Sequence, residues 1–82
     1  MDKNKEYKII NTLTTYGELA DNAKHRIGRT GKFIRLTKGM PFEFCYSNTD
    51  NCIHSSLVEN IVEADGTLTV QTLNTVYVFK CI

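Results

Sequence analysis

Hydrophobic and polar residues alternate along most of the chain with the two-residue period of strands that bury one face. Phe42–Tyr46 carries three aromatic side chains on one face, and Thr67–Thr72 directs Leu68 and Val70 to one side in the same way. The same pattern predicts strands over further segments: Tyr7–Leu13, Lys32–Leu36, Leu57–Glu63 and Thr75–Cys81. The pattern therefore indicates mainly β-structure.

Residues that favour turns separate these strands. Asp65-Gly66 is the strongest hairpin signal in the chain, because both residue types accept the positive φ of a tight two-residue turn. Glycine, proline and short polar residues predict further turns at Lys38–Pro41, Ser47–Asn51 and Leu73–Asn74. Short strands joined by tight turns favour antiparallel pairing between neighbours.

One segment has the spacing of an amphipathic helix. Its apolar residues recur every three or four positions: Tyr16, Leu19, Ala20, Ala23 and Ile27. Thr15 and Glu18 have the spacing of a capping box, and Gly28 stands where a left-handed residue ends a helix. We therefore predict a helix over residues 16–27. The alternative is a β-hairpin that turns at Arg29–Lys32 and has residues 23–28 as its first strand.

These elements predict a single small domain over residues 7–82, preceded by a flexible polar N-terminus over residues 1–6. Five or six short strands indicate a small antiparallel sheet or an SH3-like barrel with one short helix packed on it. The final strand is apolar on both faces, so each face must pack against another part of the protein. Either the helix or a second subunit packs on the second face, and we expect Tyr77 and Phe79 at such an oligomer interface.

The charged residues are unevenly distributed. Residues 1–38 hold nine Lys/Arg against four Asp/Glu, whereas residues 39–82 hold one against five, so a net charge of +1 conceals a polarised molecule. No acid interrupts the run of six basic residues Lys24, Arg26, Arg29, Lys32, Arg35 and Lys38. Such a run either attracts an anionic partner or forms a solvated face.

Gly28–Lys32 (GRTGK) invites comparison with a phosphate-binding P-loop, but its spacing is wrong. Arg26 stands where that motif needs its first glycine, and Phe33 stands where it needs a hydroxyl ligand for magnesium. The two glycines still leave backbone amides beside cationic side chains, an arrangement that suits an oxyanion. We predict anion contacts from five residues: Arg26, Arg29, Lys32, Arg35 and Lys38.

The three cysteines, Cys45, Cys52 and Cys81, cannot all pair within one chain. No apolar leader segment and no apolar run of about 18 residues is present, so we expect free thiols in the reducing cytoplasm. The same cysteines with His54 are candidate zinc ligands, but the chain has no C-x2–4-C pair. We therefore predict neither a metal site nor a cofactor.

Candidate catalytic groups are few. His25 and His54 are the only histidines, and no orienting acid adjoins either of them in the sequence. We predict that the protein is not an enzyme. The aromatic residues Phe42, Phe44 and Tyr46 resemble a base-stacking stripe, but a chain of this size without Trp needs such rings for its core.

The resulting hypothesis is a small non-enzymatic binding protein that engages a nucleotide, a nucleic acid or an acidic protein surface through residues 24–38. The alternative is a protein–protein interaction or inhibitor module that self-associates or binds another chain through its C-terminal strand. Richness in Lys, Asn, Ile and Thr fits an AT-rich genome, such as that of a low-GC bacterium or its phage. A phage-encoded inhibitor of host defence is the third hypothesis.

Overall fold

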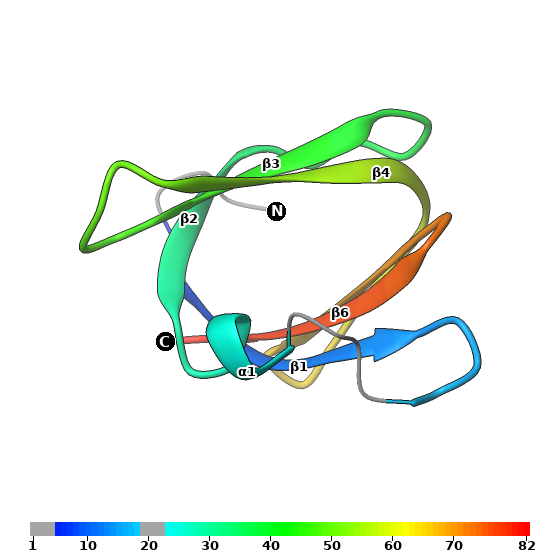
Figure 1. Ribbon diagram of the computed structural model, residues 1–82, viewed down its shortest axis with the longest axis horizontal. Coiled ribbons are helices and arrows are strands. Elements are labelled where there is room, and N and C mark those ends of the chain that lie inside the picture. Colours follow the sequence, from blue (N-terminus) through cyan, green and yellow to red (C-terminus); the bar gives the residue numbers. More distant parts are fainter. Residues whose placement is uncertain (1–4, 19–22) are drawn as a thin grey trace.

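Six antiparallel strands close into a barrel in the computed structural model, which describes residues 5–18 and 23–82 (Figure 1). The elements are β1 (Tyr7–Thr14), α1 (Ala23–Arg26), β2 (Thr30–Arg35), β3 (Pro41–Tyr46), β4 (Cys52–Ala64), β5 (Thr67–Thr72) and β6 (Thr75–Cys81). Each strand pairs with the next one along the chain, and β6 pairs with β1 to close the ring. The predicted fold class, a small antiparallel barrel with one short helix, is confirmed.

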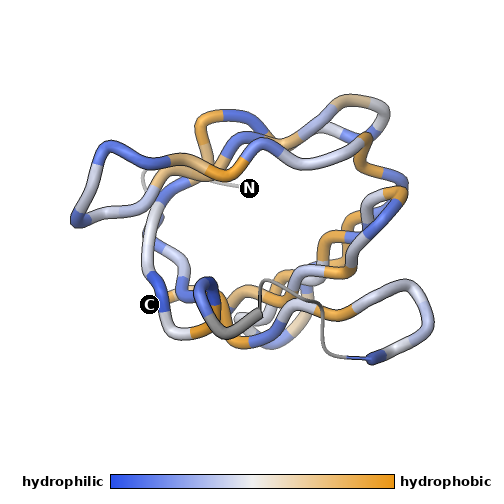
Figure 2. The backbone as a smooth tube through the Cα atoms, viewed as in Figure 1, coloured by the Kyte–Doolittle hydropathy of each residue, from blue (hydrophilic) through white to orange (hydrophobic). Residues whose placement is uncertain are grey.

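The core fills the inside of this ring with side chains from every strand. Hydrophobic positions recur along the strands in Figure 2, and the inward ones are eleven of the described residues: Tyr7, Ile9, Phe33, Phe42, Phe44, Ile53, Val58, Leu68, Val70, Tyr77 and Phe79. Phe33 lies among several rings, with centroids 4.8 Å from Phe79 and 4.9 Å from Phe44. These edge-on contacts favour a dense aromatic core. Core packing is thus confirmed for Phe42 and Phe44.

The last strand is buried on the face that we expected to meet another subunit. The side chains of Tyr77 and Phe79 are 4% and 0% exposed, and the Tyr77 ring packs 4.9 Å from that of Phe42. Val76 and Val78 point outward and stay half-buried. The prediction of an oligomer interface at Tyr77 and Phe79 is therefore wrong, because the barrel itself covers both rings.

The predicted helix over residues 16–27 is wrong at its start and confirmed at Ala23–Arg26. Its start is a closed turn, in which the Thr14 hydroxyl accepts hydrogen bonds from the backbone amides of Tyr16 and Glu18. Those bonds take the place of the expected capping box, so no helix begins there. Residues 19–22 lie outside the described residues, and α1 comprises only Ala23–Arg26. The alternative, with residues 23–28 as a strand, is also wrong.

The end of α1 joins the helix to β1. Gly28 has φ of 90°, the left-handed conformation expected of a residue that ends a helix. Its backbone amide donates to the carbonyl of Ile9, and the Ile9 amide donates to the carbonyl of Arg29. These bonds extend the short β1–β2 ladder, which pairs only Tyr7 with Gly31 and Lys8 with Thr30.

The long strand β4 belongs to two ladders. Its first half pairs with β3, starting at Cys45 opposite Cys52, and its second half pairs with β5. The ladder with β5 begins at Val58, and its register shifts between Val58 and Asn60. The hairpin after β4 has the predicted turn, since Asp65 and Gly66 have φ of 53° and 78°.

The start of the described chain is held against the barrel. Glu6 accepts a hydrogen bond from the Ser47 hydroxyl, and its carbonyl accepts one from the amide of Ile82. The prediction of a flexible N-terminus is therefore wrong at Glu6, and the first four residues lie outside the described ones. No helix in the described part of the chain is long and apolar enough to cross a membrane.

Candidate functional site: a basic hollow beside a disulfide

The basic residues predicted as anion contacts are distributed over the end of α1, β2 and the loops that flank β2. Lys32 lies in mid-strand, whereas Arg26 precedes the strand and Lys38 follows it in the exposed turn before β3. Strands rise about 3.3 Å per residue, so a charge at each end of β2 is about 20 Å from the other. The five cations are therefore spread from the end of α1 to the turn before β3.

Two of these arginines already have partners within the barrel. The Nη1 atom of Arg26 donates to the hydroxyl of Tyr77 over 2.9 Å, and Arg35 donates from Nε to the carbonyl of Pro41 over 3.0 Å. Both bonds hold the guanidinium against the protein surface. Arg26 and Arg35 are therefore the weaker candidates for contacts to a ligand.

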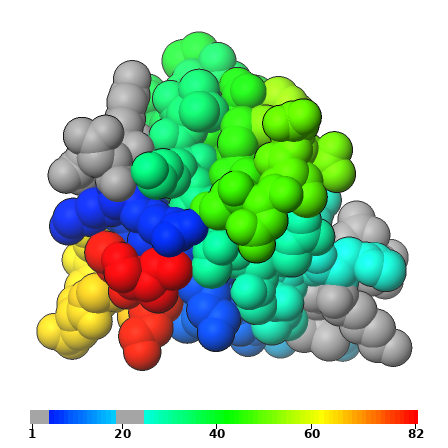
Figure 3. Space-filling model, turned by 90° about the vertical axis from the view of Figure 1, so that its left-hand side faces the viewer, coloured from blue at the N-terminus to red at the C-terminus, as the bar shows by residue number. Residues whose placement is uncertain are grey.

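Tyr46 links Arg29 and Lys32, because Arg29 stacks on its ring and Lys32 lines the same hollow as Tyr46. The Arg29 guanidinium carbon lies 4.0 Å from the centroid of the Tyr46 ring, which is a close cation–π contact. Tyr46 also lines an open hollow of about 440 Å³, together with Glu6, Lys32, Ile34, Cys45 and Ser47. The segments that supply these residues meet on the face shown in Figure 3, where the blue N-terminal residues touch the green end of β3 and its loop.

The hollow also contains one negative charge. The Glu6 carboxylate lines it and accepts the hydrogen bond of the Ser47 hydroxyl, which fixes its position. Among the lining residues Lys32 and Glu6 balance each other, and Arg29, which stacks on Tyr46, adds a positive charge beside the hollow. An anion that entered the hollow would nevertheless meet repulsion from Glu6.

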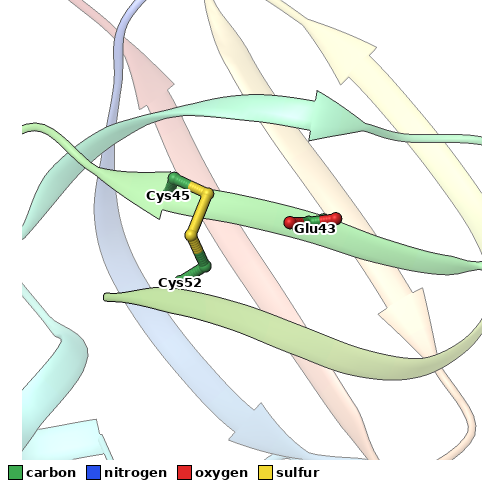
Figure 4. Close-up of side chains that lie close together, drawn as sticks. All are labelled: Glu43, Cys45 and Cys52. Carbon is green, nitrogen blue, oxygen red and sulfur yellow. A yellow bond between two sulfur atoms is a disulfide. The ribbon is translucent and has the colours of Figure 1, made fainter. Parts of the chain in front are cut away.

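The predicted free thiols at Cys45 and Cys52 are wrong, because these residues form a disulfide between β3 and β4 (Figure 4). They are directly opposed in the ladder, with their Cα atoms 4.0 Å apart. Cys81 is the free cysteine, and it is half-buried. The carboxylate of Glu43 lies beside the disulfide, so that its oxygen and the two sulfur atoms are all within 4.8 Å of one another.

The two histidines differ in their distance from this cluster, because only His54 adjoins it. His25 is exposed in α1, and His54 is exposed in β4 as the cross-strand partner of Glu43. Neither is among the grouped atoms within 4.8 Å. The prediction that the protein is not an enzyme stays a prediction.

Sequence reasoning missed three features of this region. It assigned Cys52 to no strand, so it could not place that residue opposite Cys45. It weighed Tyr46 only for base stacking or the core, and it treated Glu6 as part of a flexible end. The pairing of Cys45 with Cys52 had one signal in the sequence: the loop Ser47–Asn51 between them has hairpin length.

Comparisons with protein-family models, with curated proteins and with solved structures found no match to this chain.

Proposed function

We propose that this protein is a small non-enzymatic binding protein that holds the phosphate group of a nucleotide or nucleic acid at the basic hollow. The observation that supports this most is the guanidinium of Arg29 on the ring of Tyr46, at a hollow that Lys32 also lines. Arg29 thereby stacks on a residue that lines the hollow, and Lys32 lines the hollow itself. Phosphate oxygens are the acceptors that such a pair fits best.

The stacking of Arg29 prepares it for binding. A guanidinium held flat on a ring has lost much of its side-chain freedom already, so it loses less on meeting a ligand. Its N–H groups lie in the guanidinium plane, and that edge stays available for a bidentate contact with phosphate. Lys32, an exposed residue of β2, then adds a second charge.

The hollow is of a size that suits a nucleotide. Its volume of about 440 Å³ lies within the range of small-ligand sites, which is roughly 300–1,000 Å³. Ile34 supplies apolar surface there, and its side chain is 52% exposed. Arg35 and Lys38 lie further along the same strand and its turn, where the phosphates of a longer nucleic acid would extend.

The test is fluorescence anisotropy with two separate probes, a labelled nucleoside triphosphate and a labelled single-stranded oligonucleotide. For Arg29→Ala with Lys32→Ala we expect affinity to fall at least tenfold, because a hydrogen bond to a charged group contributes about 1.5–3 kcal/mol. Lys80→Ala removes an exposed lysine from β6 and should change affinity less than twofold. Binding by the wild type should also weaken steeply as salt rises. Unchanged binding by the double variant would refute the site.

Glu6 gives a second test in the opposite direction. Glu6→Gln keeps an oxygen acceptor for the Ser47 hydroxyl but removes the negative charge that lines the hollow. We expect the affinity for either probe to rise several-fold at low salt, since a like charge within a few ångströms is removed. Glu59→Gln, on the exposed part of β4, is the matched control. A loss of affinity in Glu6→Gln would place the anion elsewhere.

The proposed ligands place the protein in the cytoplasm, where nucleotides and nucleic acids are abundant. A protein that sequesters a nucleotide signal would inhibit whatever that signal controls, and inhibition of a host defence system by a phage-encoded protein is one such role. A reducing cytoplasm opens disulfides that are accessible to thiols. The Cys45–Cys52 disulfide would then be reduced to two thiols.

A further inference from the structure

The outer surface of the β3–β4 hairpin gathers three metal-binding side chains. Glu43 and Cys45 are two residues apart on β3, so both project outward from the sheet. Cys52 faces Cys45 across the ladder from β4. The sulfur atoms and a Glu43 oxygen lie within 4.8 Å of one another, and all three residues are half-buried (Figure 4).

The barrel holds these donors in place independently of the disulfide. The residues on the opposite face of the same hairpin, Phe42, Phe44 and Ile53, are buried in the core. Their packing fixes the register that puts Cys45 opposite Cys52. Opening the disulfide would therefore leave two thiols and a carboxylate in nearly the same positions.

We propose that reduction of the Cys45–Cys52 disulfide creates a binding site for Zn²⁺ formed by Glu43, Cys45 and Cys52, with water as the fourth ligand. Two thiolates and a carboxylate are donors that zinc accepts, and three protein ligands with an open fourth position are a known zinc arrangement. Bound zinc and the disulfide exclude each other, because both need the same sulfur atoms. The inference does not depend on anion binding at the basic hollow.

The reaction that exposes the site is thiol–disulfide exchange with a dithiol reductant. One thiolate of the reductant attacks a sulfur of the disulfide and breaks the S–S bond, and its second thiol then releases the other cysteine. The protein gains two electrons and two protons as two thiols, and the reductant becomes a disulfide. Zinc binding afterwards displaces one proton from each thiol. Cys45 lines the open hollow, so a reductant can reach it.

A positive charge near the site suits the negatively charged zinc complex. Zn²⁺ with two thiolates and one carboxylate has a net charge of −1. Lys32 on β2 is the cross-strand partner of Cys45, so a cation stands in the next strand beside the site. A positive neighbour stabilises thiolates and a negatively charged metal centre.

The experiment compares oxidised and reduced wild-type protein. After reduction with a non-thiol phosphine and its removal under anaerobic conditions, zinc is titrated in competition with a chromophoric chelator. We expect one zinc per reduced chain and none for the oxidised chain. Co²⁺ in place of zinc should give a thiolate-to-metal charge-transfer band in the reduced protein alone.

Four variants locate the site. Cys45→Ser and Cys52→Ser should each lower zinc affinity of the reduced protein at least a hundredfold, and Glu43→Gln about tenfold. Cys81→Ser keeps both ligating cysteines and is the matched control, with an expected change below twofold. Zinc binding by the oxidised chain, or equal binding by Cys45→Ser and wild type, would overturn the assignment.

Circular dichroism of the reduced, metal-free protein completes the test. We expect the β-sheet spectrum to persist, because the core lies on the other face of the hairpin. Absence of zinc binding by a folded reduced chain would refute the proposal. Unfolding on reduction would refute it too, since the site requires the β3–β4 register.

Discussion

At the scale of single residues, two buried threonines differ in whether their hydroxyl groups form hydrogen bonds. Thr12 is 0% exposed, and its hydroxyl has no hydrogen-bond partner among the described residues. Thr72 is 1% exposed, and its hydroxyl donates to the carbonyl of Thr75 over 2.9 Å and accepts from the Thr75 amide over 3.1 Å. A buried hydroxyl costs free energy unless it is paired, so the two side chains should respond differently to the same substitution.

Replacing each of these threonines with valine tests that difference. Thr12→Val should raise the free energy of unfolding by about 1 kcal/mol, since it removes an unpaired buried hydroxyl and keeps the shape. Thr72→Val should lower it by about 1–3 kcal/mol, because the Thr75 amide loses its acceptor. Urea denaturation of both variants measures the effect. Destabilisation of equal size in both would contradict this account.

Residue identity predicted some of the candidate site and missed the rest for a physical reason. The basic run on β2 was visible, because charge needs no knowledge of pairing. The contact of Arg29 with Tyr46 depends on how β2 and β3 pair, and the approach of Glu6 depends on where the chain end lies. Neither relation is present in local sequence spacing.

At the scale of elements, β3 leaves no room for a side chain on β2 at Gly31. A Cβ atom added to this residue would lie 2.2 Å from the Cys45 carbonyl oxygen and 2.8 Å from a ring carbon of Phe44. Such contacts are far below van der Waals distance, and one of them is to backbone. The side chain at this position must therefore be absent.

Gly31→Ala should destabilise the barrel, although alanine suits a strand at least as well as glycine. We expect a loss of about 2–3 kcal/mol from overpacking between β2 and β3. Lys32→Ala, at the next and exposed position, should change the free energy of unfolding by less than about 0.5 kcal/mol. Thermal and urea denaturation compare the two variants. If Gly31→Ala left the free energy of unfolding unchanged, β2 and β3 would be able to move apart without cost.

The predicted elements were most accurate where a clear period ended in a strong turn. Thr67–Thr72 and Thr75–Cys81 were predicted with the bounds that β5 and β6 have. The first half of β4 was missed, because its burial does not alternate strictly and its ladder with β3 shifts register between the pairs Glu43–His54 and Pro41–Leu57. The predicted helix was wrong at its start, where Thr14 accepts the amides of Tyr16 and Glu18 in a turn, and right at Ala23–Arg26.

At the scale of the whole molecule, closing the sheet gives every strand one face toward the core and one face on the outer surface. The two faces of β6 therefore differ in burial, although both carry apolar residues in the sequence. Tyr77 and Phe79 face the core, whereas Val76 and Val78 share the outer surface. The sequence predicted that β6 needs two covers but contains no local signal for which face the barrel encloses.

Introducing a charge on each face of β6 tests this assignment. Tyr77→Glu places a carboxylate in the aromatic core and should unfold the protein, at a cost of about 4 kcal/mol or more. Val78→Glu, one residue away and outward, should cost about 1 kcal/mol or less and leave the sheet intact. Circular dichroism distinguishes the two outcomes. A folded Tyr77→Glu variant that only changed its oligomeric state would restore the discarded interface.

The ladder between β1 and β6 has a consequence for how the protein is made. Tyr7 pairs with Cys81 and Thr14 pairs with Thr75, so the first strand waits for the last one to be synthesised. Until the ribosome has released residue 81, the growing chain has two unpaired strand edges and an incomplete apolar interior. Nascent chains arrested before that point should be digested readily by added protease, and full-length ones should resist it.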